Sequence, residues 1–201
     1  MCYTKTASGR CMRASAGCRN LFYQNHCRIP CGIHSVFSNT FIFDAENDGK
    51  EGYLYSLVTT SIIQGIKSIP VYVEADVSDG MPLFEMVGSL SPEVKESKER
   101  VRTALKNTGY ILPPKRITIN FIPANIRKTG SGFDLPVVAA VLCAIGIVPE
   151  EALKDTMVVG EISLSGDVKP VNGILPMVAE AKERGVTRCI VPAENQTEAL
   201  L

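Results

Sequence analysis

Histidine is scarce in this sequence: His26 and His34 are the only two among 201 residues, and both precede residue 55. A zinc hydrolase needs clustered histidine and carboxylate ligands, and a Ser-His-Asp hydrolase needs a histidine base. The region from 55 to 201 therefore supports neither class. Only a serine nucleophile with a lysine base remains to be considered.

Long apolar runs and phosphate-binding motifs are also missing. No run of eighteen apolar residues occurs, so no membrane span is expected, and no apolar h-region is present, which excludes a secretory signal. No G-x-x-x-x-G-K-[ST] string occurs either, so we expect no bound nucleotide or other cofactor in this chain. These absences favour a cytoplasmic protein.

Acidic residues are missing from the first 43 positions, which carry five basic residues and most of the cysteines. Only Cys143 and Cys189 lie further along, in apolar runs where a free thiol behaves as a small hydrophobe. The main body thus resembles a reduced, intracellular protein.

Residues 1–54 are interpreted as a poorly ordered, basic, cysteine-rich tail or a mis-assigned start, ahead of one domain spanning 55–201. His26, Cys27, Cys31 and His34 suggest zinc, but their spacing contains no paired C-x-x-C, so no metal site is predicted. An organellar presequence would explain the missing acids, although no amphipathic period is present. A natural start near Tyr55 is the third alternative.

From residue 71 onward the pattern is that of an α/β (α+β) domain. Alternating apolar residues predict strands at 71–78 and 117–121, and we expect the first to form a hairpin with 83–87. Helices are predicted from Ser91 to about Thr108, from Asp134 as the capping residue to about Ile145, and from Ile174 to Gly185. Short strands at 157–164, 168–171 and 188–191 complete a mixed sheet covered by helices.

Positive charge in this domain occurs in two settings. The mixed Lys, Arg and Glu residues of the 91–108 helix are interpreted as a solvated face. Four basic residues outside it are candidates for contact with the phosphates of nucleic acid: Lys115, Arg116, Arg127 and Lys128. The loop 128–132 contains two glycines before a helix, but it is interpreted as a tight turn rather than a phosphate cradle.

Several strings in this region resemble one family in order and spacing. They are VSDGMP (77–82), ERVRTALKN (99–107), PPKRITIN (113–120), KTGSGFDLP (128–136), GEISLSG (160–166) and VPAEN (191–195). Together they resemble the N-terminal domain of the YifB/ComM family of magnesium-chelatase-like AAA+ ATPases.

The resemblance implies the fold of the Lon protease C-terminal domain, incomplete at its C-terminus, without peptidase activity. Lon-type proteases use a serine at the start of the buried helix and a lysine in the helix after the glycine-rich return. Those positions fall on Phe133 and Leu175, neither of which can attack a carbonyl or accept a proton. The alternative is a displaced pair, a cryptic peptidase using Ser131 with Lys169, which precedes the last predicted helix.

The resemblance further implies a non-enzymatic module placed ahead of an AAA+ ATPase, serving assembly or DNA engagement in DNA processing and branch migration. We expect its partners to be the ATPase module or further copies, and DNA, but no membrane. ATP and Mg are expected only for the ATPase module, which this chain lacks. Magnesium insertion into a porphyrin rests on the family label alone.

Overall fold

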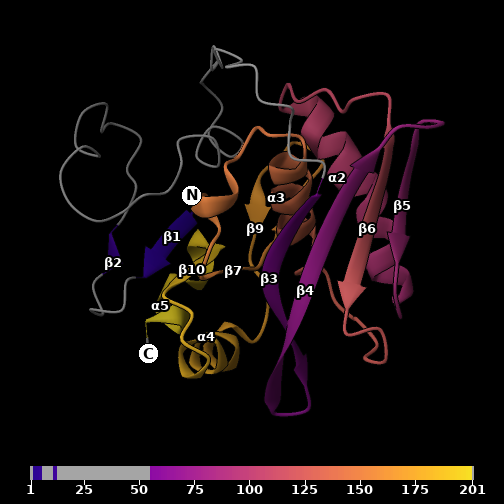
Figure 1. Cartoon of the computed structure of the whole chain (residues 1–201). Coiled ribbons are helices and arrows are strands. Elements are labelled where there is room, and N and C mark those ends of the chain that lie inside the picture. The colour runs from indigo at the N-terminus through magenta and orange to yellow at the C-terminus, as the bar shows by residue number, and fades with distance from the viewer. Residues whose placement is uncertain (1, 6–10, 13–54, 201) are drawn as a thin grey trace.

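The computed structural model describes residues 2–5, 11–12 and 55–200 (Figure 1). Its strands are β1 (Cys2–Lys5), β2 (Cys11–Met12), β3 (Tyr55–Gln64), β4 (Lys67–Ser78), β5 (Leu83–Val87), β6 (Arg116–Ile122), β7 (Thr156–Val158), β8 (Glu161–Ile162), β9 (Val168–Lys169) and β10 (Arg188–Pro192). Its helices are α2 (Pro92–Asn107), α3 (Asp134–Ala144), α4 (Ile174–Glu183) and α5 (Gln196–Ala199), with 3-10 turns at Glu150–Ala152 and Ala193–Asn195. The zinc hypothesis for His26, Cys27, Cys31 and His34 lies outside the described residues.

The main sheet is mixed, as the sequence predicted. Its order is β2-β1-β10-β7-β3-β4-β6-β5, and the six strands from β10 to β5 belong to the region after residue 54. Strand β4 runs antiparallel to β3 on one side and to β6 on the other, whereas β10 with β7, β7 with β3, and β5 with β6 are parallel. Strands β8 and β9 form a separate two-stranded ribbon. The chain is therefore an α/β domain built on one sheet.

The predicted hairpin between 71–78 and 83–87 is wrong. Strand β4 pairs with β3 on one side and β6 on the other, and β5 lies beyond β6. The partner of β4 is β3, joined to it through the turn at Gly65, whose φ of 65° suits glycine. Because α2 carries the chain from β5 back to the start of β6, these two strands are parallel, and β6 occupies the place next to β4.

Helices cover both faces of the sheet, but unequally. The Ser56 hydroxyl on β3 donates to the Ala140 carbonyl of α3 (2.7 Å), and α2 packs on α3 and β5 on the same side. Ser61 is five residues further along β3, so its side chain points to the opposite face of the sheet. Its hydroxyl donates to Glu180 of α4 (3.3 Å), which places α4 on that opposite face. Figure 1 shows α2 and α3 side by side behind the long strands.

Helix α3 lies at the centre of the fold. All eleven of its residues are buried, which confirms the prediction that a helix without a polar face is enclosed. It packs on β3 and β4, whose inward residues include Val58, Val71 and Val73. The position of α3 fixes the location of the segment just before it, where the sequence placed its candidate catalytic residues.

Candidate functional site around the start of α3

Lys128 lies in the loop after β6, and its backbone pairs with the segment that precedes α2. Its N–H donates to the Ser89 carbonyl (2.8 Å), and its carbonyl accepts from the Ser91 N–H (2.9 Å). The side chain is fully buried, and its Nζ donates to the carbonyls of Phe121 (3.3 Å) and Pro123. Burial lowers the pKa of this amine. Lys128 therefore joins the end of β6 to the following loop and is not available to a phosphate on the surface.

Phe133 occupies the position where the resemblance places a catalytic serine. Its side chain is buried, and its ring meets that of Phe121 edge-to-face, with centroids 5.6 Å apart and planes at 89°. A side chain in this position faces the hydrophobic core. The position of the catalytic serine in Lon-type proteases is therefore occupied here by an aromatic ring that packs against Phe121 of β6.

The backbone N–H groups at the start of α3 already have partners. The Asp134 N–H points to the Ser131 carbonyl (3.4 Å), the Leu135 N–H donates to the Gly160 carbonyl (3.0 Å), and Pro136 has no N–H. A phosphate cradle or an oxyanion hole requires free, convergent N–H donors. The first turn of α3 offers none, which agrees with a tight turn rather than an anion site.

Asp134 does not cap α3 as the sequence predicted. Phe133 is the N-cap residue, without a capping side-chain hydrogen bond, and Asp134 is the first residue of the helix. The buried Asp134 carboxylate instead accepts two bonds from Arg100 of α2, from Nε (2.8 Å) and a terminal nitrogen (3.0 Å), and one from the Ile162 N–H (3.2 Å). Hydrogen bonding to Asp134 raises the pKa of Arg100. This buried ion pair joins α2, α3 and β8.

The segment before α4 lies next to the segment before α3. A Cβ placed on Gly132 would lie 3.2 Å from the Val159 side chain and 3.7 Å from the Val171 side chain, so Gly132 packs against the residue that lies three positions before α4. Leu175, at the lysine position of Lon-type proteases, is 41% exposed, and its N–H donates to Glu198 of α5 (3.1 Å). The residues at the serine and lysine positions of Lon-type proteases are thus both hydrocarbon side chains, Phe133 buried and Leu175 exposed.

The displaced pair Ser131 and Lys169 is not assembled. Ser131 is half-buried, and Lys169 is exposed on β9 with its amine 3.8 Å from Asp167. Within residues 55–200, no hydrogen bond joins the Ser131 hydroxyl to a lysine amine. Catalysis by such a pair needs this contact or a single bridging water.

The four basic candidates are not brought together. Lys115 and Arg116 lie at the start of β6 and are paired with Asp79 (3.1 Å) and Glu85 (3.0 Å). Arg127 is exposed beyond the other end of this strand, and six residue steps along β6 amount to roughly 20 Å. With Lys128 buried, only Lys115 and Arg116 form a local basic pair.

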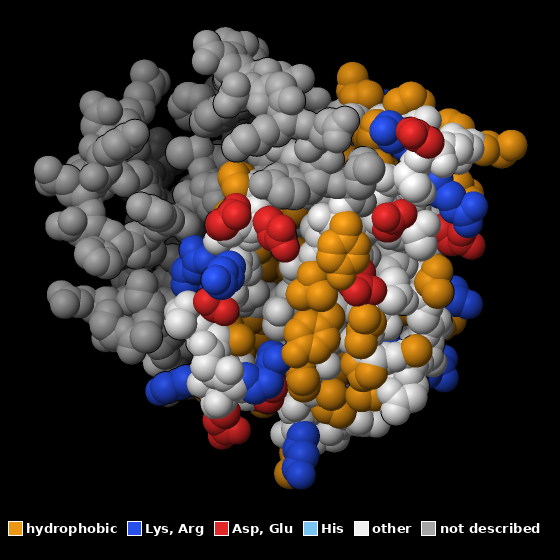
Figure 2. Space-filling model, in the orientation of Figure 1, with side chains coloured by type: hydrophobic (Ala, Val, Ile, Leu, Met, Phe, Trp, Pro, Cys, Tyr) orange, Lys and Arg blue, Asp and Glu red, His pale blue; other side chains and the backbone are white. Residues whose placement is uncertain are grey.

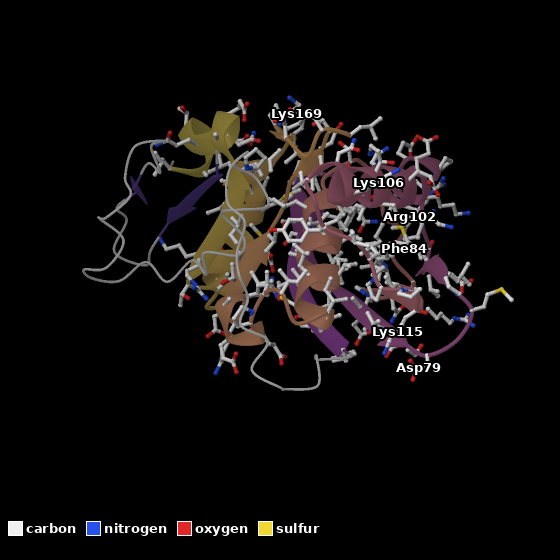
Figure 3. All side chains as sticks on the ribbon, turned by 90° about the horizontal axis from the view of Figure 1, so that it is seen from above. Asp79, Phe84, Arg102, Lys106, Lys115 and Lys169 are labelled. Atoms are coloured by element: carbon white, nitrogen blue, oxygen red, sulfur yellow. The ribbon has the colours of Figure 1, made fainter. Side chains whose placement is uncertain are left out.

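A different basic surface runs along α2. Lys95, Lys98, Arg102 and Lys106 follow one another at i, i+3, i+7 and i+11, which places them on one side of the helix; we call them the α2 stripe. The C-terminal end of α2 lies against the turn between β8 and β9, where the Asn107 amide donates to the Leu164 carbonyl (2.7 Å). In Figure 3, Arg102 and Lys106 lie on α2, and Lys115 lies apart from them, beside Asp79. The spacing was readable in the sequence, but it was interpreted as a solvated face.

Other types of site are not found in the described part of the chain. No group of three or more His, Cys, Asp or Glu residues there is arranged to hold a metal ion. None of the helices in that part is both long enough and apolar enough to span a membrane.

Comparison with known proteins places this architecture in a wider group. A family model described as "Subunit ChlI of Mg-chelatase" matches residues 73–195. YifB of Escherichia coli is 38% identical over 143 residues, and the competence protein ComM of Haemophilus influenzae is 34% identical over 146 residues. These alignments cover 71% and 73% of this chain but only 28% of each relative. Lon protease 2 of Bacillus subtilis is 34% identical over 127 residues, which cover 60% of this chain and 22% of that protease.

Proposed function

This chain belongs to the family of the ChlI subunit of Mg-chelatase, and on that premise we propose that it is a non-catalytic, Lon-like module of a larger AAA+ protein of the YifB and ComM type. The ATPase activity, with its ATP and Mg, belongs to a part that this chain does not contain. The module works in the cytoplasm, in assembly with the ATPase part or further copies, and in DNA processing such as branch migration.

One observation carries the non-catalytic half of the proposal: the positions that would hold a Ser-Lys pair carry Phe133, which is buried, and Leu175, which is exposed. The Phe133 side chain packs in the core, and the N–H groups beside it are bonded to other backbone atoms. A site of this kind lacks a nucleophile, a base and an oxyanion hole at once. The similarity to Lon protease 2 thus supports a shared fold without shared chemistry.

A serine-directed fluorophosphonate probe tests the peptidase alternative. We expect no specific labelling of the chain, because Ser131 has no base within hydrogen-bond reach. Labelling is measured by mass spectrometry beside heat-unfolded chain and a Ser131→Ala variant. Labelling of native chain that disappears in Ser131→Ala would show an activated serine and overturn the proposal.

The DNA half of the proposal rests on the α2 stripe rather than on the four residues selected from the sequence. Among the described residues, Glu99 is the only acidic residue in an ion pair with the stripe. Its carboxylate lies 3.5 Å from Arg102, and the Glu99 side chain is 69% exposed. Exposed ion pairs are weak and readily exchanged for a phosphate. From Lys95 to Lys106 the stripe runs roughly 16 Å along the helix axis, so it offers a row of four cations that can follow a DNA backbone.

Reversing two charges of the stripe is expected to weaken DNA binding. In a salt titration with single-stranded and branched DNA, the Arg102→Glu, Lys106→Glu variant should bind at least about tenfold more weakly at low salt. The slope of log K against log salt should fall by about two, since two phosphate contacts are lost. A matched variant, Lys67→Glu with Lys182→Glu, reverses two exposed charges on other elements and should bind normally.

Two results would remove direct DNA contact from the proposed function. One is the absence of any affinity for DNA at low salt. The other is an equal loss in both double variants, which would reflect net charge rather than a defined surface.

A further inference from the structure

Among the described residues, α2 and α3 cover one side of strands β3, β4, β6 and β5, and α4 covers only part of the other side. Their inward residues lie beneath α2 and α3, and α4 reaches only the neighbouring part of the other side, where Arg184 donates to the Tyr72 hydroxyl (3.2 Å). We call the remaining outward side of these four strands the open face. The register places Leu57, Glu74, Asn120 and Val87 in one row across it.

The open face exposes large apolar side chains. Tyr55 is 49% exposed, Leu57 40% and Val87 45%, while Tyr72 and Ile122 are half-buried neighbours. Figure 2 shows hydrophobic side chains gathered in a strip along the front of the molecule, with acidic side chains beside it. Contiguous apolar surface with a polar rim is typical of protein interaction sites.

The charge of the open face is predominantly negative and partly fixed in place. Glu74 stands within the apolar strip, and its carboxylate accepts from the Tyr55 hydroxyl (2.7 Å) and the Asn120 amide (2.8 Å). The bond to Glu74 raises the pKa of Tyr55 to about 12, so the phenol stays a donor at neutral pH. Asp76 and Glu85 lie in the next row, and Arg116, one row further along, donates to the Glu85 carboxylate (3.0 Å).

These charges decide between occupants. A second copy docked through the same face would place the carboxylates of Glu74 and Asp76 against their own equivalents, which is unfavourable for a two-fold contact. An occupant with apolar residues and flanking Lys or Arg would complement both features. Four strands about 4.8 Å apart span roughly 14 Å between the outer two, room for one helix of about 10 Å beside α4.

We propose that the open face is a docking site for an amphipathic helix of a partner protein, which sets its apolar side on Leu57, Tyr72 and Val87 and its basic residues against Glu74 and Asp76. This surface lies on the opposite side of the sheet from the α2 stripe. The proposal is therefore independent of DNA binding, and the two fail separately.

The test uses the whole chain and two synthetic helical peptides of about five turns. Both carry leucine along one side, and the flanks are lysine in one peptide and glutamate in the other. Fluorescence anisotropy should show binding of the lysine peptide, with the glutamate peptide at least about tenfold weaker. Leu57→Lys should weaken binding of the lysine peptide at least about tenfold, since it removes an apolar anchor and adds a like charge.

The matched control is Ile111→Lys, the same type of change at an apolar residue that is 89% exposed outside the open face. It should leave the affinity for the lysine peptide within about twofold. Circular dichroism is measured for both variants, and both should remain folded because the positions are exposed. Leu57→Lys is also titrated with DNA, which separates this proposal from the proposed function.

Three results would overturn the proposal. Equal binding of the two peptides would show that charge does not select the occupant. Unchanged binding in Leu57→Lys would place the peptide elsewhere. Sedimentation of the chain as a dimer that Leu57→Lys dissociates would assign the open face to a second copy.

Discussion

Replacing Asp134 with alanine is expected to lower the free energy of unfolding by about 3 kcal/mol. The change leaves the Arg100 guanidinium without its bidentate partner and the Ile162 N–H without its acceptor. Removing one member of a buried pair is costly because the other charge stays desolvated. Arg100 is 24% exposed on its side chain, so water relieves part of this penalty, and the lower end of the usual range applies.

The change in stability is measured by urea denaturation, with the slope checked for two-state behaviour. Glu96→Ala is the control, because it removes a distant, exposed partner of the same arginine (4.0 Å) and should cost less than about 0.5 kcal/mol. If Asp134→Ala were as mild as Glu96→Ala, the pair would not be what holds α2 against α3.

Restoring the Lon-type side chains is expected to produce no peptidase. A Phe133→Ser, Leu175→Lys double variant gains a hydroxyl and an amine, but the hydroxyl would lie against Phe121 in the core. The neighbouring N–H groups would remain bonded to Ser131 and Gly160 carbonyls. Losing the buried ring should also destabilise the chain by about 3–5 kcal/mol.

Hydrolysis of a fluorescent casein substrate and urea denaturation are measured together at a temperature where the variant is folded. Leu175→Lys alone changes an exposed side chain and should be nearly neutral for stability. Turnover by the double variant that is abolished in Phe133→Ala, Leu175→Lys would contradict the proposal that the whole site, and not only two side chains, is unsuited to catalysis.

Local patterns were sufficient for most individual elements. The alternation around Val71 and Ile117 and the breaks at Gly109 and Gly185 correspond to β4, β6 and the ends of α2 and α4. Strand β3 was not among the predicted strands. Its buried side includes Ser56 and Thr60, whose hydroxyls interrupt the apolar alternation on which the prediction depends.

Which strands lie next to each other in the sheet was harder to predict from the sequence. The predicted hairpin of 71–78 with 83–87 depends on closeness in sequence. In the structure, β6 lies between β4 and β5, because α2 returns the chain from the end of β5 to the place beside β4. Such pairings depend on which apolar faces can be buried together, and residues far apart in the chain decide this.

The candidate site shows the same division. Phe133 and Leu175 were identified from the resemblance, and their hydrocarbon chemistry follows from the sequence alone. The burial of Lys128 and the partnership of Asp134 with Arg100 were missed, because a lysine in a polar loop and an aspartate before a helix usually lie in water.

By itself the sequence determined the family, the types of most helices and strands, and the lack of a nucleophile and a base at the Lon-type positions, since these depend on residue identity and local spacing. Only the tertiary structure decided the strand order, which charges are buried and paired, and which face of the sheet stays open. Desolvation and packing depend on neighbours brought together from distant parts of the chain, and a linear pattern does not contain that information.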